Sequence, residues 1–393
     1  MTRYRFGFWA VAFAFLIVMA FATLPSPLYG LYRERDHLSA FTITTVYAVW
    51  AASTIATLIA VPFIAKRIGR RGVMLAAVAT MMMAAGELAV WKALPGLLVG
   101  RLLTGVAVGM AAGTAITYLI ELRLRTDPGG SPAVARTIGT SVNVGALGIG
   151  PLVAGCLAAW VSHPLSLSYV VWIALGAVAF GGLVPAPDTG TPTPARAPFS
   201  VRLPAAASAA ALAAFAANGL FAGLSGLILA TTFHHTSHAL AGATLFIVFT
   251  AGVLSQLLTA RLGASRVFAL GTISMLAGLV FLVAAVRLSS PSLVLFLVSG
   301  GLIGAGAGAV YKGTSGLVLD RSAPENRVAL TAELLIVLFV GLSVPVIGAG
   351  VALDRGASPP NTVLGFAILV GVGVAGAGWG LLGRGVARSP QAT

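Results

Sequence analysis

The chain has 393 residues, of which 58% are hydrophobic and 9% are charged, and its mean hydropathy is +0.98. An ordinary soluble domain is about 25% charged, so the composition excludes one. The formal net charge of +14 would suit a nucleic-acid partner, but lysine and arginine are concentrated in every second loop, as in a polytopic membrane protein. We therefore expect a lipid bilayer around this chain and no nucleic acid.

Apolar stretches of about 20 residues recur along the chain, and each is long enough to cross a hydrocarbon core of about 30 Å. They do not alternate in polarity as barrel strands do, so we expect helices. The first stretch follows Arg3 and Arg5 like a signal peptide, but removing it would leave an odd number of spans, so we interpret it as a retained helix. The sequence thus predicts an all-α membrane protein with twelve spans, at 7–29, 41–63, 72–92, 97–120, 137–160, 168–185, 205–231, 240–260, 266–287, 293–318, 328–352 and 361–383.

Several spans carry polar or aromatic residues that are candidates for lining a substrate cavity. An amide that faced lipid would lack hydrogen-bond partners, so the two asparagines are the favoured candidates. For any one candidate, helix packing or interfacial anchoring is a commoner role than contact with a substrate. In chain order the candidates are Tyr47, Trp50, Tyr118, Asn143, Asn218, Phe221 and Tyr311.

A polar connector rich in proline, threonine and glycine separates the two sets of six spans. The shift that carries Pro151 onto Pro345 also carries Gly69, in a basic turn, onto Gly263, in a second basic turn. Two related halves of membrane helices are the usual plan of a secondary transporter. We expect an N-terminal bundle at 1–185, a cytoplasmic linker at 186–204 and a C-terminal bundle at 205–393, with both termini in the cytoplasm.

Four ionisable residues lie inside spans, where each costs roughly 2.5–3.5 kcal/mol on insertion scales. Glu87 and Arg101 lie at similar depth in the first half, and Lys312 and Glu333 do so in the second. Two ion pairs are therefore possible, and they could simply pin neighbouring helices. Alternatively one carboxylate binds and releases a proton, because making and breaking an ion pair changes its proton affinity.

Histidine and cysteine give weaker signals. His234, His235 and His238 cluster in a short outer loop, and their spacing permits a metal site, but we favour a solvated loop and expect no metal. Cys156 is the single cysteine, so no disulfide framework is possible.

Several segments resemble the major facilitator superfamily, most closely its bacterial twelve-helix drug:proton antiporter branch. The loop from Pro62 to Arg71 is similar to the family signature between helices two and three, and it keeps Gly69, Arg70 and Arg71. In the family an aspartate there takes part in a charge-relay latch, but here Lys66 replaces it, so the latch must be rebuilt or weakened. The other matching positions are Leu97, Arg101 and Gly105 of the fourth-helix pattern, Gly150, Pro151 and Gly155 of the fifth-helix antiporter signature, and the proline pair Pro25 and Pro27.

The resemblance implies the major facilitator fold and ranks the ionisable residues. Span eleven flanks the central cavity in that fold, so Glu333 is the first candidate for a proton carrier, with Lys312 as its switchable partner. Glu87 is second, because third helices of the superfamily usually face lipid, and Arg101 carries the fourth-helix role. The first span lacks the acidic residues that multidrug members use for cations, which favours a neutral, zwitterionic or anionic substrate.

The function expected is proton-coupled export of small molecules, such as drugs or metabolites, by alternating access. Uptake of a sugar, amino acid or other metabolite, facilitated or proton-coupled, is the alternative. No motif of an intramembrane hydrolase and no nucleotide-binding loop is present, so neither an enzyme nor a nucleotide-driven pump is expected. We expect a cofactor-free monomer in a bacterial-type inner membrane, with protons and a small molecule as its partners.

Overall fold

The computed structural model describes residues 2–190, 202–323 and 326–383. In these ranges the secondary structure is helical, and no strand is present. Eleven of the described helices are long and apolar enough to cross a membrane. The expected all-α fold is therefore confirmed, and the chain is a multi-pass membrane protein.

The longest helix, α3 (Ala40–Val90), contains two of the expected spans. A straight helix of its 51 residues would extend about 75 Å, whereas a hydrocarbon core is about 30 Å thick. The backbone leaves the helical region at Gly69, where φ is 71° and ψ is 173°. Because glycine has no Cβ, it adopts this positive φ without strain and permits the break between the two helices. The eleven helices are thus consistent with twelve spans.

The chain divides into two compact units. Unit 1 comprises Met1–Ala195 and Thr236–Phe246, and unit 2 comprises Arg196–His235 and Ile247–Thr393. The first part of α8 (His238–Leu258) therefore belongs with unit 1 and the remainder with unit 2. The bundle boundaries expected at 185 and 205 stay a prediction, because residues 191–201 of the linker lie outside the described ranges.

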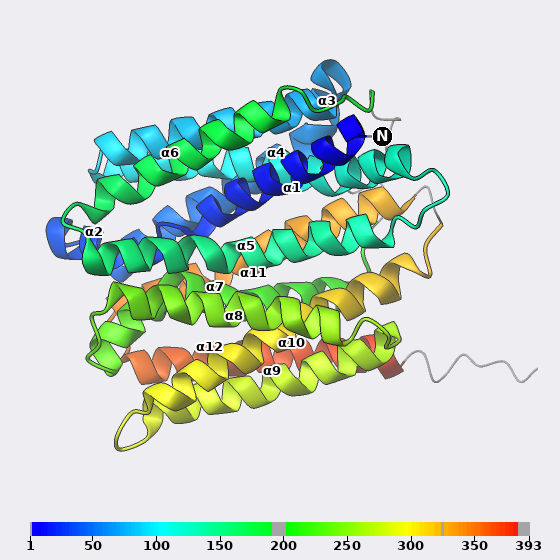
Figure 1. Cartoon of the computed structure of the whole chain (residues 1–393). Coiled ribbons are helices and arrows are strands. Elements are labelled where there is room, and N and C mark those ends of the chain that lie inside the picture. The colour runs from blue at the N-terminus through cyan, green and yellow to red at the C-terminus, as the bar shows by residue number, and fades with distance from the viewer. Residues whose placement is uncertain (1, 191–201, 324–325, 384–393) are drawn as a thin grey trace, which may run out of the picture. The chain divides into compact units, whose positions relative to one another are not determined.

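Unit 1 is organised around α1 and α4. Helix α1 packs against α4, α5 and α6, and α3 packs against α4 and α6; Figure 1 shows α1 in dark blue among them. A proline pair, Pro25 and Pro27, follows the end of α1 and interrupts the helical hydrogen bonds there. Besides α3, the elements are α1 (Thr2–Thr23), η1 (Ser26–Leu28), α2 (Tyr29–Asp36), α4 (Leu94–Thr126), α5 (Ala133–Trp160) and α6 (Pro164–Leu183).

Glycine allows close helix contacts in unit 1. A Cβ at Gly150 of α5 would overlap the carbonyl group of Ala20 in α1. A Cβ at Gly155 would meet the carbonyl oxygen of His238 at the start of α8. Backbones approach this closely only where side chains are absent, so the two glycines of the α5 signature have a packing role in this structure.

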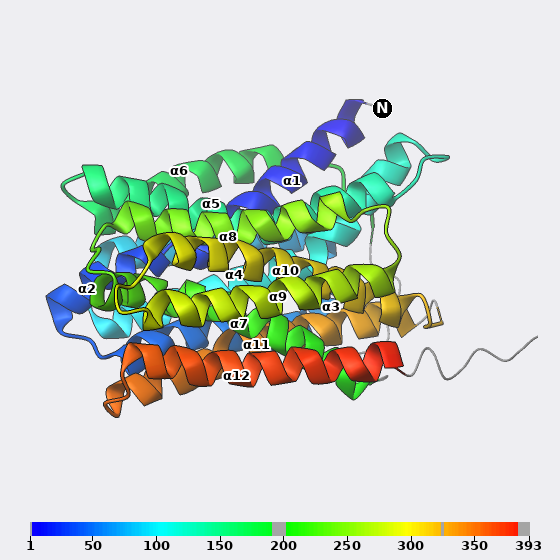
Figure 2. The same ribbon diagram turned by 90° about the horizontal axis from the view of Figure 1, so that it is seen from below.

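Unit 2 holds the remaining helices. Helix α10 packs against α9 and α7, α11 packs against α7, and α12 packs against α7 and α9. Figure 2 shows α12 in red at the lower edge of the view, seen from below. The elements besides α8 are α7 (Ala205–Thr232), α9 (Ala264–Arg287), α10 (Leu293–Leu319), α11 (Arg327–Asp354), α12 (Pro359–Gly378) and the π-helical turn η3 (Trp379–Gly383).

The repeat seen in the sequence is preserved at the prolines and altered at the basic turns. Pro151 lies inside α5 and Pro345 lies inside α11, and both helices continue past them. Gly69 needs its positive φ, whereas Gly263 precedes α9 with an ordinary φ of −65°. The two basic turns therefore differ in backbone geometry, although their glycines share a sequence position.

Candidate functional site

A cationic and aromatic cluster lies inside unit 1 around Arg101 of α4. The Arg101 side chain is fully buried, and its Nη1 donates a 2.7 Å hydrogen bond to the carbonyl oxygen of Ala22 in α1. Its guanidinium carbon lies 5.2 Å from the ring centre of Trp50 and 5.9 Å from that of Tyr47, both on α3. The fold thus brings together three residues that the sequence identified separately. Cation–π attraction stabilises the buried charge.

The ion pair between Arg101 and Glu87, which their matched depth made possible, is not formed in this structure. Arg101 belongs to none of the ion pairs among the described residues. The Glu87 carboxylate lies against the first turns of α4, because a Cβ at Gly96 or Gly100 would meet it. This position keeps it from pairing with the Arg101 guanidinium. Neither carboxylate oxygen of Glu87, both of which are buried, has a hydrogen-bond partner within the described ranges.

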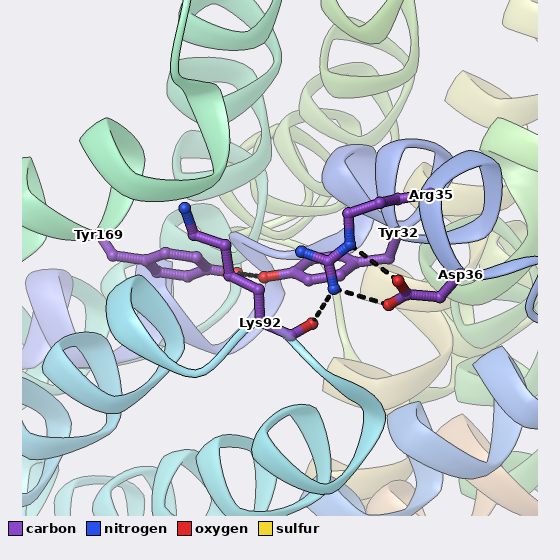
Figure 3. Close-up of polar contacts among 5 residues, drawn as sticks. All are labelled: Tyr32, Arg35, Asp36, Lys92 and Tyr169. Carbon is purple, nitrogen blue, oxygen red and sulfur yellow. Dashed lines mark hydrogen bonds and ion pairs between the residues drawn. The ribbon is translucent and has the colours of Figure 1, made fainter.

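The short helix α2 lies next to the Arg101 cluster. It occupies the end of unit 1 opposite to the N-terminus (Figure 1). The hydroxyl group of Tyr29, at the start of α2, lies beside the Arg101 guanidinium. The buried hydroxyl oxygens of Tyr32 and Tyr169 are 3.3 Å apart (Figure 3). This hydrogen bond fastens α2 to α6.

Arg35 makes a second attachment of α2, at its C-terminal end. Its Nε donates a 2.8 Å hydrogen bond to Asp36, and its Nη2 lies 2.7 Å from the other carboxylate oxygen of that residue. The same Nη2 donates to the backbone carbonyl oxygen of Lys92, in the turn before α4 (Figure 3). Helix α2 is therefore held to both α6 and the start of α4.

The opposite end of unit 1 carries the basic turn and an ion pair. Arg70 Nε lies 2.6 Å from Glu121 Oε2 near the end of α4. Lys66, which replaces the family aspartate, is exposed. A Cβ at Gly69 would instead meet the carboxylate of Asp188, which follows α6. Two acidic residues outside the signature, Glu121 and Asp188, therefore lie against the basic turn.

A segment after α6, residues 184–189, crosses this end of unit 1, and we call it the strap. Arg71 Nη1 donates to the carbonyl oxygens of Val184, at 3.1 Å, and Ala186, at 3.4 Å. The Tyr118 hydroxyl donates a 2.8 Å hydrogen bond to the carbonyl oxygen of Pro187. Thr189 donates to the Glu121 carboxylate. Tyr118, a candidate cavity residue in the sequence, therefore has its hydroxyl engaged by the strap.

In unit 2, Lys312 and Glu333 do not form the expected ion pair. Lys312 Nζ donates to the carbonyl oxygen of Gln256, at 2.7 Å, and to Thr259 Oγ1, at 3.3 Å, near the end of α8. Glu333 is 8% exposed, and its Oε2 accepts a 3.1 Å hydrogen bond from the backbone N–H of Leu203, just before α7. Each group therefore has separate, uncharged partners in this structure, and the switchable pairing of Lys312 with Glu333 stays a prediction.

The remaining cavity candidates lie in both units. The side-chain oxygens of Asn143 in α5 and Asn218 in α7 are buried and lack hydrogen-bond partners among the described residues. Phe221 is buried in unit 2, and the ring of Tyr311 lies edge-on to Phe215 with a centroid distance of 5.6 Å. The unpaired amides keep the asparagines as candidates, while the aromatic residues have packing partners.

The histidine loop forms no metal centre in this structure. His234 and His235 are exposed, and His238 Nδ1 lies 3.1 Å from the carbonyl oxygen of Pro27. Among the described residues, no group of three or more His, Cys, Asp and Glu side chains could hold a metal ion. Cys156 is a free thiol.

Sequence reasoning missed Glu121, the strap and the role of α2. Glu121 is one of only ten acidic residues and lies beside a basic pair at the end of α4, which was a usable signal for a helix-end ion pair. The contacts of Tyr32 and the strap pair side chains with groups that are distant in sequence, so no local pattern identified them.

Comparison with known proteins supports the fold. Residues 1–187, slightly less than half of the chain, match a family model described as "Sugar (and other) transporter". A solved structure, "Crystal structure of nucleoside transporter NupG (D323A mutant)", superposes with a TM-score of 0.69 and 10% sequence identity, covering 96% of this chain and 99% of that one. No curated protein matches the chain. The expected major facilitator fold is confirmed, and at this level of identity the likeness shows the fold alone.

Proposed function

We propose that this protein is a secondary transporter, which carries a small solute across a membrane by alternating access. The observation that supports this function best is a fold shared with a solved transporter over 96% of the chain. The transporter family model that matches residues 1–187 supports the same conclusion. Transport also explains why ionisable side chains are kept inside apolar spans despite a cost of roughly 2.5–3.5 kcal/mol each.

A proton gradient is the energy source that we propose, with Glu87 as its first candidate carrier. Both carboxylate oxygens of Glu87 are buried without a hydrogen-bond donor in the described part of the chain. A charged carboxylate in such a place costs several kcal/mol, and the cost is removed when the group carries a proton. Binding and release of a proton at Glu87 would therefore change how α3 packs against the first turns of α4.

Glu333 takes second place in this proposal, which reverses the order expected from the sequence. Its carboxylate accepts the backbone N–H of Leu203 next to the start of α7. This contact lies next to a helix N-terminus, where a carboxylate is favoured, so it suits a structural role in which Glu333 anchors α11 to α7. Lys312, bound to uncharged groups of α8, then has a positioning role of its own.

We propose export as the direction of transport, because α5 carries a sequence signature that resembles that of antiporters. Two glycines of this signature, Gly150 and Gly155, make close helix contacts in the structure. Uptake is the second candidate function. The family model named for sugar transport and the likeness to a nucleoside transporter favour it. Asn143, in unit 1, and Asn218, in unit 2, stay separate candidates for contact with solute. We propose a monomer whose termini face the cytoplasm of a bacterial-type inner membrane.

Solute flux in reconstituted vesicles tests the transport function. Purified protein is reconstituted with a trapped pH-sensitive dye, and sugars, nucleosides and organic acids are added one at a time. We expect at least one solute to move protons with it. The sign of the pH change, in vesicles of determined orientation, separates antiport from symport. If every solute moved without protons, the coupling would be refuted, and if none moved, the transport function would be refuted.

Two glutamine variants test the carrier. Glu87→Gln mimics the protonated side chain, so we expect solute exchange to persist and proton-driven accumulation to disappear. Glu333→Gln keeps an oxygen that can accept the Leu203 N–H, so we expect accumulation to be largely retained. The opposite pattern would return Glu333 to first place.

A further inference from the structure

The Arg101 cluster presents hydrogen-bond donors that have no acceptor. Arg101 carries five N–H donors and no acceptor. Among the described residues, its Nη1 donates to the Ala22 carbonyl group, and the Tyr29 hydroxyl lies beside the guanidinium. Nε and Nη2 lack a partner of normal geometry among the described residues, as does the Tyr47 hydroxyl. A buried polar group left unpaired costs about 1–3 kcal/mol. The cluster is therefore an arrangement that one acceptor-rich group would complete.

A carboxylate fits these donors better than other small groups. Guanidinium and carboxylate match as two parallel hydrogen bonds, which are shorter and stronger than neutral ones. Arg101 takes part in no ion pair with the described acidic residues. The groups that face its charge there are neutral: the rings of Tyr47 and Trp50 and the Ala22 carbonyl oxygen. The aromatic side chains around the charge favour a planar acid over an aliphatic one.

Helix α2 closes this cluster. Tyr29 and Tyr32 of α2 are buried, and Tyr29 lies next to Arg101. The polar contacts of the helix include the hydroxyl–hydroxyl contact between Tyr32 and Tyr169, at 3.3 Å, and the contact of Arg35 with the backbone of Lys92 (Figure 3). Opening of α2 would break these contacts and withdraw Tyr29 and Tyr32 from the interior, while the long helices keep their own packing.

We propose that the Arg101 cluster is the binding site for the carboxylate of a small planar organic acid, and that α2 is the lid that admits it. The acid is the transported substrate only if the proposed transport function holds, whereas binding of the acid can be tested without transport. Binding is measured on the purified full-length protein in detergent, where no flux occurs.

The probes are benzoate, nicotinate and cinnamate, each compared with its uncharged amide by calorimetry. We expect at least one acid to bind roughly 10- to 100-fold more tightly than its amide, the factor that charge-assisted hydrogen bonds supply. Equal affinity for acid and amide, or no binding of any of the three acids, would overturn the proposal. Binding without flux in vesicles would instead refute the transport function and leave the site intact.

Variants locate the site. Arg101→Lys keeps the charge but loses the planar pair of donors, so we expect the preference for acid over amide to fall about tenfold. Because a change at a fully buried arginine can prevent folding, Tyr47→Phe is the second variant: it removes one hydroxyl group, keeps the ring, and should weaken acid binding about 2- to 10-fold. Tyr118→Phe is the matched control, a buried hydroxyl at the far end of the same unit, and should leave acid binding unchanged. Equal effects of the two phenylalanine variants would overturn the assignment.

The lid has its own measurement. Tyr169→Phe removes the hydroxyl contact with Tyr32. In stopped-flow experiments we therefore expect the association rate constant of whichever acid binds to rise about 2- to 10-fold. An unchanged association rate would show that α2 does not control entry.

Discussion

The ion pair between Arg70 and Glu121 should stabilise unit 1 measurably. The two groups are 2.6 Å apart, and their side chains are 13% and 31% exposed. An exposed pair contributes about 0.2–1 kcal/mol, whereas breaking a fully buried pair costs about 3–5 kcal/mol. This pair lies between those limits, and Glu121 also accepts a hydrogen bond from Thr189 of the strap. We therefore expect Glu121→Gln to lower the free energy of unfolding by about 1–2 kcal/mol.

A double-mutant cycle isolates the pair from these other contacts. Arg70→Gln, Glu121→Gln and the double variant are unfolded in mixed micelles by titration with sodium dodecyl sulfate, and we expect a coupling free energy of about 1 kcal/mol. Arg123 and Asp127 supply the matched control, because they are 3.5 Å apart and 38% and 49% exposed, so their coupling should stay below about 0.5 kcal/mol. If the Arg70–Glu121 coupling did not exceed that of the control, our account of this ion pair would be refuted.

Three further substitutions test local geometry by the same unfolding measurement. Gly69→Ala should destabilise the protein by about 1–3 kcal/mol, because the φ of 71° at Gly69 is strained for other residues. Gly263→Ala is the control and should be tolerated, because φ at Gly263 is −65°. Equal effects of the two substitutions would contradict the assigned backbone geometry of the turn. Gly150→Val should lower the free energy of unfolding by about 1–3 kcal/mol, because the new side chain would overlap a carbonyl group of α1. Gly348→Val is the control and should lower it less, because Gly348 has open space around it. A tolerated Gly150→Val would refute the close contact. Tyr118→Phe should cost about 0.5–1.5 kcal/mol and speed hydrogen exchange in the strap; unchanged exchange would show that this hydrogen bond does not hold it.

Much of the fold could be predicted from the sequence, because membrane spans are encoded locally. The spans, the two basic turns and the intrahelical prolines follow from apolar length and from residue types at short range. The unusual backbone at Gly69 also agrees with its place in a family signature. Gly263 shows the limit of this reasoning, since a matching position in the second half adopts an ordinary φ.

The sequence predicted which residues belong to the candidate sites but not which of them contact each other. Depth along a helix placed Glu87 beside Arg101 and Lys312 beside Glu333, but depth does not fix which face of a helix a residue occupies. In the structure Glu87 lies against the first turns of α4, while Arg101 points towards α1. The acceptors that replaced the expected partners are mostly backbone carbonyl groups, which the sequence does not distinguish from one another.

The central claim is that the two units alternate access to a solute, and a distance measurement tests it most directly. After Cys156→Ala, spin labels are placed at Ser162, between α5 and α6, and at Ser289, between α9 and α10, and their separation is measured by pulsed electron resonance in lipid. We predict two distance populations whose ratio changes with pH in the native protein and no longer changes with pH after Glu87→Gln. One narrow population that responds to neither pH nor solute would contradict the account.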